Sequence, residues 1–160
     1  MVASELDGIG TEHLSELEHM GYDYVEMPLA EMMRLDGPNF LELKRRVDRL
    51  TIGCEVCNNF FPKHMRLTGQ EVRMDLVLSY AERALTRAKD LGATCVVFGS
   101  GSAKNVPKGT SLEKGYQQIV DLLNQIASLA ANRDIIICIE PLRKQECNLI
   151  NTFEEGGRLA

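Results

Sequence analysis

Long apolar runs are missing from this chain of 160 residues, and so is an excess of basic side chains. No apolar run approaches the roughly 18–20 residues that a membrane-spanning helix needs, so we expect no contact with a membrane. The first ten residues, MVASELDGIG, contain neither the basic start nor the apolar stretch of a secretory signal peptide. The formal net charge of −5 disfavours a nucleic-acid surface, which needs a basic footprint. We therefore expect no nucleic-acid partner.

A complete set of cysteine or histidine ligands for a zinc site is also missing. The five cysteines are an odd number, and we interpret them as reduced thiols of a cytoplasmic protein. Cys54 and Cys57 have the spacing of redox and zinc motifs, but no second pair follows them. Since side chains three residues apart in a regular strand point to opposite faces, we expect these two thiols to lie apart. His13, His19 and His64 are not expected to be metal ligands.

Helical and strand-like segments alternate along the chain. The apolar patterns predict strands over residues 22–27, 51–57, 93–99 and 134–140, and helices over residues 11–20, 39–50, 70–91, 112–131 and from residue 152 onward. Such alternation predicts right-handed βαβ units and a parallel sheet, with residues 100–111 as a loop. We expect one α/β domain over residues 1–160. Because a helix stands before the first strand and another begins at the last residues, we expect this domain to be incomplete.

A glutamate ends the most apolar of these strands. Ile135, Ile136, Ile137 and Ile139 precede Glu140, and they predict a strand that is buried on both faces. Ligands of parallel α/β folds bind at the carboxyl ends of the strands. An unpaired buried carboxylate costs on the order of several kcal/mol, which a divalent metal would offset. On spacing alone, backbone amides or an arginine would serve as well.

Two further glutamates have positions of interest. Glu146 follows Glu140 by six residues on the next loop, where an ordinary solvated charge would also be expected. Glu26 lies near the end of the first predicted strand, where a structural role is as likely as a functional one. Neither position decides the function by itself.

The segment CIEPLRKQECNLINT, residues 138–152, resembles the fifth-strand segment of the xylose isomerase-like TIM-barrel family. GYDYVEMPL, residues 21–29, resembles the second strand of that family, and ATCVVFGSGSAKNVPKG, residues 93–109, resembles its fourth strand and the following loop. The resemblance covers nearly the whole chain. It implies a (β/α)8 TIM barrel, of which this chain carries about half, namely barrel strands two to five.

The family includes sugar and sugar-phosphate isomerases and ketose 3-epimerases. The resemblance therefore implies a metal-dependent isomerase or epimerase that moves a proton next to the carbonyl of a sugar or sugar phosphate. Glu140 matches a metal ligand that also acts as one of two acid–base carboxylates, and Glu146 matches a residue that contacts substrate hydroxyls. Oxygen ligands suit Mn²⁺ or Mg²⁺. The family's other ligands come from later strands that this sequence lacks, so we expect low activity or none from the chain alone.

Two other functions stay open. A half-barrel that pairs with a second copy would cover its open sheet edges, which gives a non-catalytic homo-oligomer. A DNA-repair endonuclease of the same superfamily would act on abasic sites, but it would need several histidines and a basic groove. Lys104 and Lys108 make the loop after the third predicted strand basic, which gives weak support for an anionic sugar.

Overall fold

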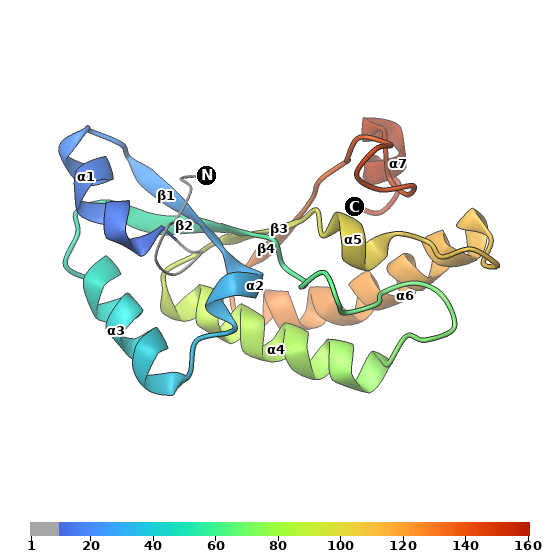
Figure 1. Cartoon of the computed structure of the whole chain (residues 1–160), viewed down its shortest axis with the longest axis horizontal. Coiled ribbons are helices and arrows are strands. Elements are labelled where there is room, and N and C mark those ends of the chain that lie inside the picture. The colour runs from blue at the N-terminus through green and yellow to red at the C-terminus, as the bar shows by residue number, and fades with distance from the viewer. Residues whose placement is uncertain (1–9) are drawn as a thin grey trace.

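The computed structural model describes residues 10–160 and shows a parallel sheet with its main helices on one side (Figure 1). The sheet order is β1-β2-β3-β4, and every neighbouring pair is parallel. The strands are β1 (Tyr24–Pro28), β2 (Gly53–Asn58), β3 (Cys95–Phe98) and β4 (Ile136–Ile139). The helices are η1 (Thr11–His13), α1 (Leu14–His19), α2 (Leu29–Met32), α3 (Gly37–Val47), α4 (Met74–Asp90), α5 (Gly101–Lys104), α6 (Leu112–Ala131) and α7 (Phe153–Gly157).

This arrangement confirms the predicted alternating α/β fold, and the sequential strand order fits half of a barrel. The two short helices α2 and α5 were not predicted, because four residues are too few to show a helical period. Three helices begin at capping side chains, since Asp36 before α3, Ser111 before α6 and Thr152 before α7 accept hydrogen bonds from the first helical turns. The long helix α4 begins after Arg73 without a side-chain cap. Within residues 10–160, no helix is long and apolar enough to cross a membrane.

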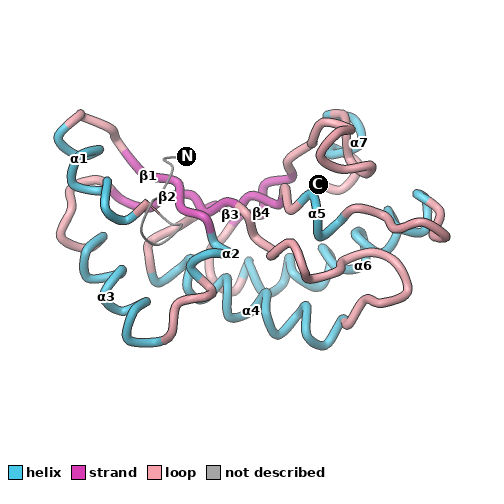
Figure 2. The backbone as a smooth tube through the Cα atoms, in the orientation of Figure 1, coloured by secondary structure: helices cyan, strands magenta, loops and turns pink. Residues whose placement is uncertain are grey.

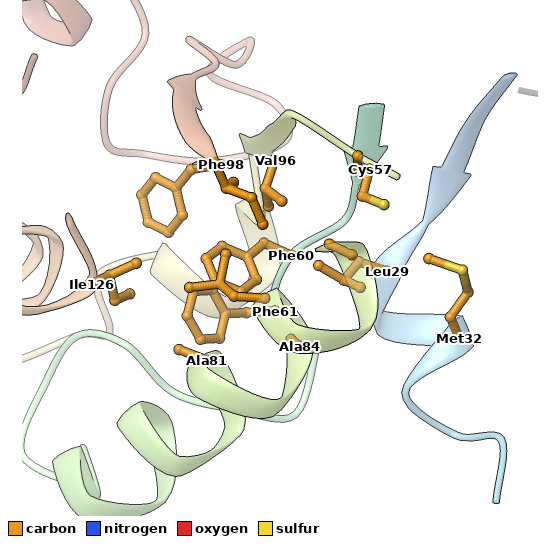
Figure 3. Packing of buried hydrophobic residues seen from close by; sticks show 14 of the residues in the cluster. Leu29, Met32, Cys57, Phe60, Phe61, Ala81, Ala84, Val96, Phe98 and Ile126 are labelled. Carbon is orange, nitrogen blue, oxygen red and sulfur yellow. The ribbon is translucent and has the colours of Figure 1, made fainter. Parts of the chain in front are cut away.

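The hydrophobic core lies between the sheet and the helices α3, α4 and α6 (Figure 2). Phe60 and Phe61 lie between Phe98 of β3 and the small residues Ala81 and Ala84 of α4 (Figure 3). The rings of Phe61 and Phe98 meet edge to face, with centroids 6.1 Å apart. The predicted apolar faces of the helices therefore form one packed layer under the sheet.

The opposite face of the sheet is open, and this corrects the expectation for residues 134–140. We predicted a strand buried on both faces, but Ile136 is 68% exposed. In the described part of the chain, β4 pairs with β3 alone and stands at the edge of the sheet. The isoleucine run therefore marks a strand that is covered on its helix side and open on the other.

A bulge in β2 corrects the prediction for the two cysteines. Val25 pairs with Cys54, but Glu26 pairs with Val56, so one residue of β2 is extra. The bulge brings the Sγ atoms of Cys54 and Cys57 to 3.9 Å, with both side chains buried. Our prediction was wrong because it assumed regular alternation. The adjacent Cys54 thiol and burial raise the pKa of Cys57, so this thiol stays protonated and unreactive.

Candidate functional site

Glu140 stands at the carboxyl end of β4, where its side chain lies across the end of β3. Its backbone N–H donates to the carbonyl of Phe98 at 3.3 Å, which holds the residue in line with the sheet. A Cβ atom at Gly99 would collide with Glu140 Oε2. Gly99 therefore leaves the space that the carboxylate occupies. The carboxylate is exposed and makes no hydrogen bond or ion pair within residues 10–160.

Lys104 of α5 fixes the backbone of this glutamate. Its side chain is fully buried, and its Nζ donates to the carbonyl oxygen of Glu140 at 3.2 Å. Nζ also lies 5.5 Å from the ring centroid of Phe98. Burial lowers the pKa of Lys104, and the nearby Cys147 and Glu140 oppose this shift. We expected Lys104 and Lys108 to make this loop basic, but Lys104 is buried and only Lys108 is exposed.

Glu146 lies on the same loop as Glu140, but it faces an arginine. Arg143 donates to Glu146 through Nε at 3.1 Å and through a terminal nitrogen at 3.1 Å. This hydrogen bonding holds the pKa of Glu146 below its ordinary value. The amide of Asn151 secures the loop by donating to the carbonyls of Leu142 at 2.7 Å and Cys147 at 2.9 Å. Cys147 is buried under this loop.

The ends of β2 and β3 carry residues with left-handed backbone. Asn59 has φ 48° and Ser100 has φ 41°, a conformation that costs on the order of 1–3 kcal/mol outside glycine. The hydroxyl of Ser100 accepts a hydrogen bond from the backbone N–H of Phe61 at 3.0 Å, which helps to hold the turn. Phe60 and Phe61 are buried and pack under the rim, and Phe61 also lines a small hollow beside Ser100.

One carboxylate oxygen and one amide oxygen near these strand ends are buried without a hydrogen-bond partner in the described part of the chain. Glu31 Oε2 and Asn58 Oδ1 make no hydrogen bond in the described part of the chain. Asn58 is the last residue of β2, so its place at a strand end was readable from the sequence. Glu31 lies in α2, which was not predicted, and no sequence pattern pointed to it. Both atoms are buried acceptors, and leaving them unpaired costs free energy.

A metal ion would find one fitting ligand in this part of the barrel. Glu140 presents an exposed carboxylate, the oxygen donor that Mn²⁺ and Mg²⁺ prefer. Residues 10–160 contain no cluster of three or more histidine, cysteine, aspartate or glutamate side chains that would complete a site. His13 and His19 lie near α1, before the first strand, and His64 lies on the loop after β2. A metal site that included Glu140 would therefore need its other ligands from outside these residues.

Comparison with known proteins gives the family and a set of similar folds. The family model of the xylose isomerase-like TIM barrel matches residues 14–160. No curated protein matches the chain by sequence similarity alone. The chain resembles 3-keto-D-glucoside 4-epimerase from E. coli, with a TM-score of 0.74 and 18% identity over 93% of this chain and 57% of the epimerase.

Two other solved structures resemble the chain to a similar degree. D-psicose 3-epimerase from Clostridium cellulolyticum, solved with D-tagatose, has a TM-score of 0.78 and 16% identity, over 93% of this chain and 52% of that enzyme. The IolI protein, solved with a bound zinc atom, has a TM-score of 0.68 and 19% identity, over 98% of this chain and 53% of that protein. The chain thus spans little more than half of each. The family match and the half-barrel geometry agree, and the chain belongs to the xylose isomerase-like TIM-barrel family.

Proposed function

We propose that this chain contributes the second to fifth strands of a sugar or sugar-phosphate isomerase or epimerase. In this proposal, Glu140 takes a proton from the carbon next to the substrate carbonyl, or returns one to it. The observation that carries the proposal is the carboxylate of Glu140, which is exposed at the carboxyl end of β4 and has no partner within residues 10–160. The sugar epimerases among the similar folds support this class of reaction.

The surroundings of Glu140 suit a proton-transfer group. The Lys104 contact holds its backbone, and the absence of a side chain at Gly99 leaves room for the carboxylate on the rim. A base that is already positioned loses little entropy when the substrate arrives. A divalent metal, Mn²⁺ or Mg²⁺, would stabilise the negative charge that develops on the substrate oxygen. Glu140 would be one of its ligands, and the others would come from the remaining strands.

Glu146 has a separate role in this proposal. Its carboxylate is half-exposed and lies on the loop that follows Glu140, which suits a contact to substrate hydroxyl groups. Its pairing with Arg143 keeps it ionised and therefore a strong acceptor. A substrate would compete with Arg143 for this carboxylate.

The test needs a complete barrel, either the whole encoded protein or this chain joined to the second half of the E. coli relative. With Mn²⁺ present, Glu140→Gln should lower turnover of ketose sugars by about 10²- to 10⁴-fold, because the amide cannot accept the proton. Glu146→Gln should mainly raise KM, by about tenfold, because it weakens a hydroxyl contact. Lys144→Ala on the same loop is the matched control and should change neither. Unchanged turnover in Glu140→Gln would refute the proposal.

A further inference from the structure

A pocket of about 570 Å³ lies beside α2, on the outer side of the loop that follows β2. The side chains of Glu31 and Arg34 line it from the α2 segment, and Lys63 and His64 line it from the loop. A smaller hollow of about 100 Å³ shares Glu31 and Lys63 with this pocket and extends to Ser100 and Gly101 after β3. The two hollows thus meet at Glu31 and lead toward the rim that carries Glu140.

The basic side chains around this pocket are not paired with other groups of the described chain. Arg34, Lys63 and His64 are exposed, and within residues 10–160 their side chains make no hydrogen bond or ion pair. Most other arginines in the described part of the chain do have such partners, as Arg143 does with Glu146. Three unpaired donor side chains around one hollow favour an anionic guest, and arginine with lysine suits a phosphate group.

The carboxylate of Glu31 is an acceptor, so it favours a ligand group that donates a hydrogen bond. Its Oε2 is buried and has no hydrogen-bond partner in the described part of the chain. The hydroxyl of Tyr80, which also lines the pocket, donates to the carbonyl of Phe60 at 3.0 Å and is therefore engaged elsewhere. The residue as a whole is only partly buried and lines both hollows, so a ligand hydroxyl group that enters there would meet this carboxylate and donate to it.

We propose that this pocket binds the phosphate end of a phosphorylated sugar. Arg34, Lys63 and His64 hold the phosphate, and Glu31 accepts a hydrogen bond from a sugar hydroxyl. The anion and hydroxyl chemistry follows from the pocket alone, whereas the choice of a sugar phosphate as the ligand rests on the proposed function. The smaller hollow reaches Gly101, which packs against the loop of Glu140, since an added Cβ would lie 2.9 Å from Leu142 Cδ1 and 3.2 Å from the carbonyl oxygen of Glu146. The sugar would extend through this hollow toward the loop of Glu140.

The test is a calorimetric titration of the 160-residue chain with D-fructose 6-phosphate, D-fructose and inorganic phosphate. We expect fructose 6-phosphate to bind more tightly than fructose. Arg34→Gln and Lys63→Gln should each weaken its binding by about tenfold or more, because each removes a charge-assisted contact. Glu31→Gln should weaken binding of fructose 6-phosphate and leave inorganic phosphate unaffected.

Two controls separate this inference from the proposed function and from general charge effects. Lys114→Gln removes an exposed lysine of α6 that is remote from the pocket lining, and it should leave all affinities unchanged. Glu140→Gln should also leave fructose 6-phosphate binding unchanged, even where it abolishes turnover. Equal affinity for fructose and fructose 6-phosphate, absence of binding at millimolar concentrations, or wild-type affinity in both Arg34→Gln and Lys63→Gln would each overturn the inference. Circular dichroism establishes that each variant is folded.

Discussion

At the scale of single residues, the site depends on one glycine beside one glutamate. Gly99 has an ordinary backbone conformation, so its backbone does not require glycine. What requires glycine is the side chain of Glu140, which occupies the place of the missing Cβ. The position of the proposed acid–base group is therefore set by residues at the ends of two neighbouring strands and not by β4 alone.

Gly99→Ala should displace the carboxylate of Glu140 without unfolding the protein, because the end of a glutamate side chain can swing aside. We predict that turnover of a complete barrel falls by about 100-fold, the usual cost of misplacing a catalytic group by about 1 Å. The free energy of unfolding, measured with urea, should change little. Gly53→Ala in β2 is the matched control, since no atom lies within 4 Å of an added Cβ there. Full turnover in Gly99→Ala would show that this contact has no part in the reaction.

The sequence predicted Glu140 as the end of a strand, because the isoleucine run before it is unmistakable. It did not predict what surrounds the carboxylate. Lys104 reads as a loop charge in the sequence, and only the folded chain brings it under the backbone of Glu140. Contacts between residues 36 positions apart leave no local pattern to read.

At the scale of elements, one side chain of helix α1 is hydrogen-bonded to the residue range just before strand β2. Glu18 of α1 accepts hydrogen bonds from the backbone N–H and the hydroxyl of Thr51, the latter at 2.7 Å. Thr51 stands just before β2, so the contact ties α1 to the start of that strand. These hydrogen bonds lower the pKa of Glu18 below its ordinary value of 4.5.

This contact predicts a pH dependence of stability. A carboxylate with a lowered pKa in the folded state contributes fully above its unfolded pKa, and the contribution is lost as the pH falls through the folded pKa. Glu18→Gln should therefore be less stable than wild type at and above about pH 4.5, and the difference should shrink as the pH falls further. Urea unfolding over a pH series measures this difference. Glu71→Gln changes an exposed glutamate and should show no such trend, and a trend equal in both variants would contradict the assignment.

The elements themselves were mostly predictable, and the exceptions have physical reasons. All four strands and the three long helices α3, α4 and α6 lie within or close to their predicted segments. The bulge in β2 was not predictable from residue types, because it is set by the pairing of β2 with β1. The exposure of Ile136 depends on whether a neighbour covers β4, which an apolar run does not reveal.

At the scale of the whole molecule, β4 has no neighbouring strand on its outer side within residues 10–160. A hollow of about 620 Å³ runs along β4, α6 and the C-terminal residues, and Ile136 and Leu123 line it. An apolar strand edge is a template for pairing with another chain. Two copies of the four-stranded sheet would together supply the eight strands of a barrel.

We therefore predict that the isolated 160-residue chain self-associates through β4. Light scattering should show a mass above that of the 17.9 kDa monomer, and Ile136→Lys should shift the population toward the monomer. Leu41→Lys on α3 is the matched control, because Leu41 is 52% exposed but lies away from the sheet edge. A monomeric wild-type chain at high concentration would contradict this prediction.

The measurement that tests the central claim most directly is hydrogen exchange at the substrate carbon. A complete barrel that contains this segment is incubated with Mn²⁺ and ketose sugars in D₂O, and carbon-bound deuterium is followed by NMR. We predict that deuterium enters at the carbon next to the carbonyl, and that Glu140→Gln abolishes this exchange while the protein stays folded. Exchange at the wild-type rate in Glu140→Gln would contradict the assignment of Glu140 as the group that transfers the proton.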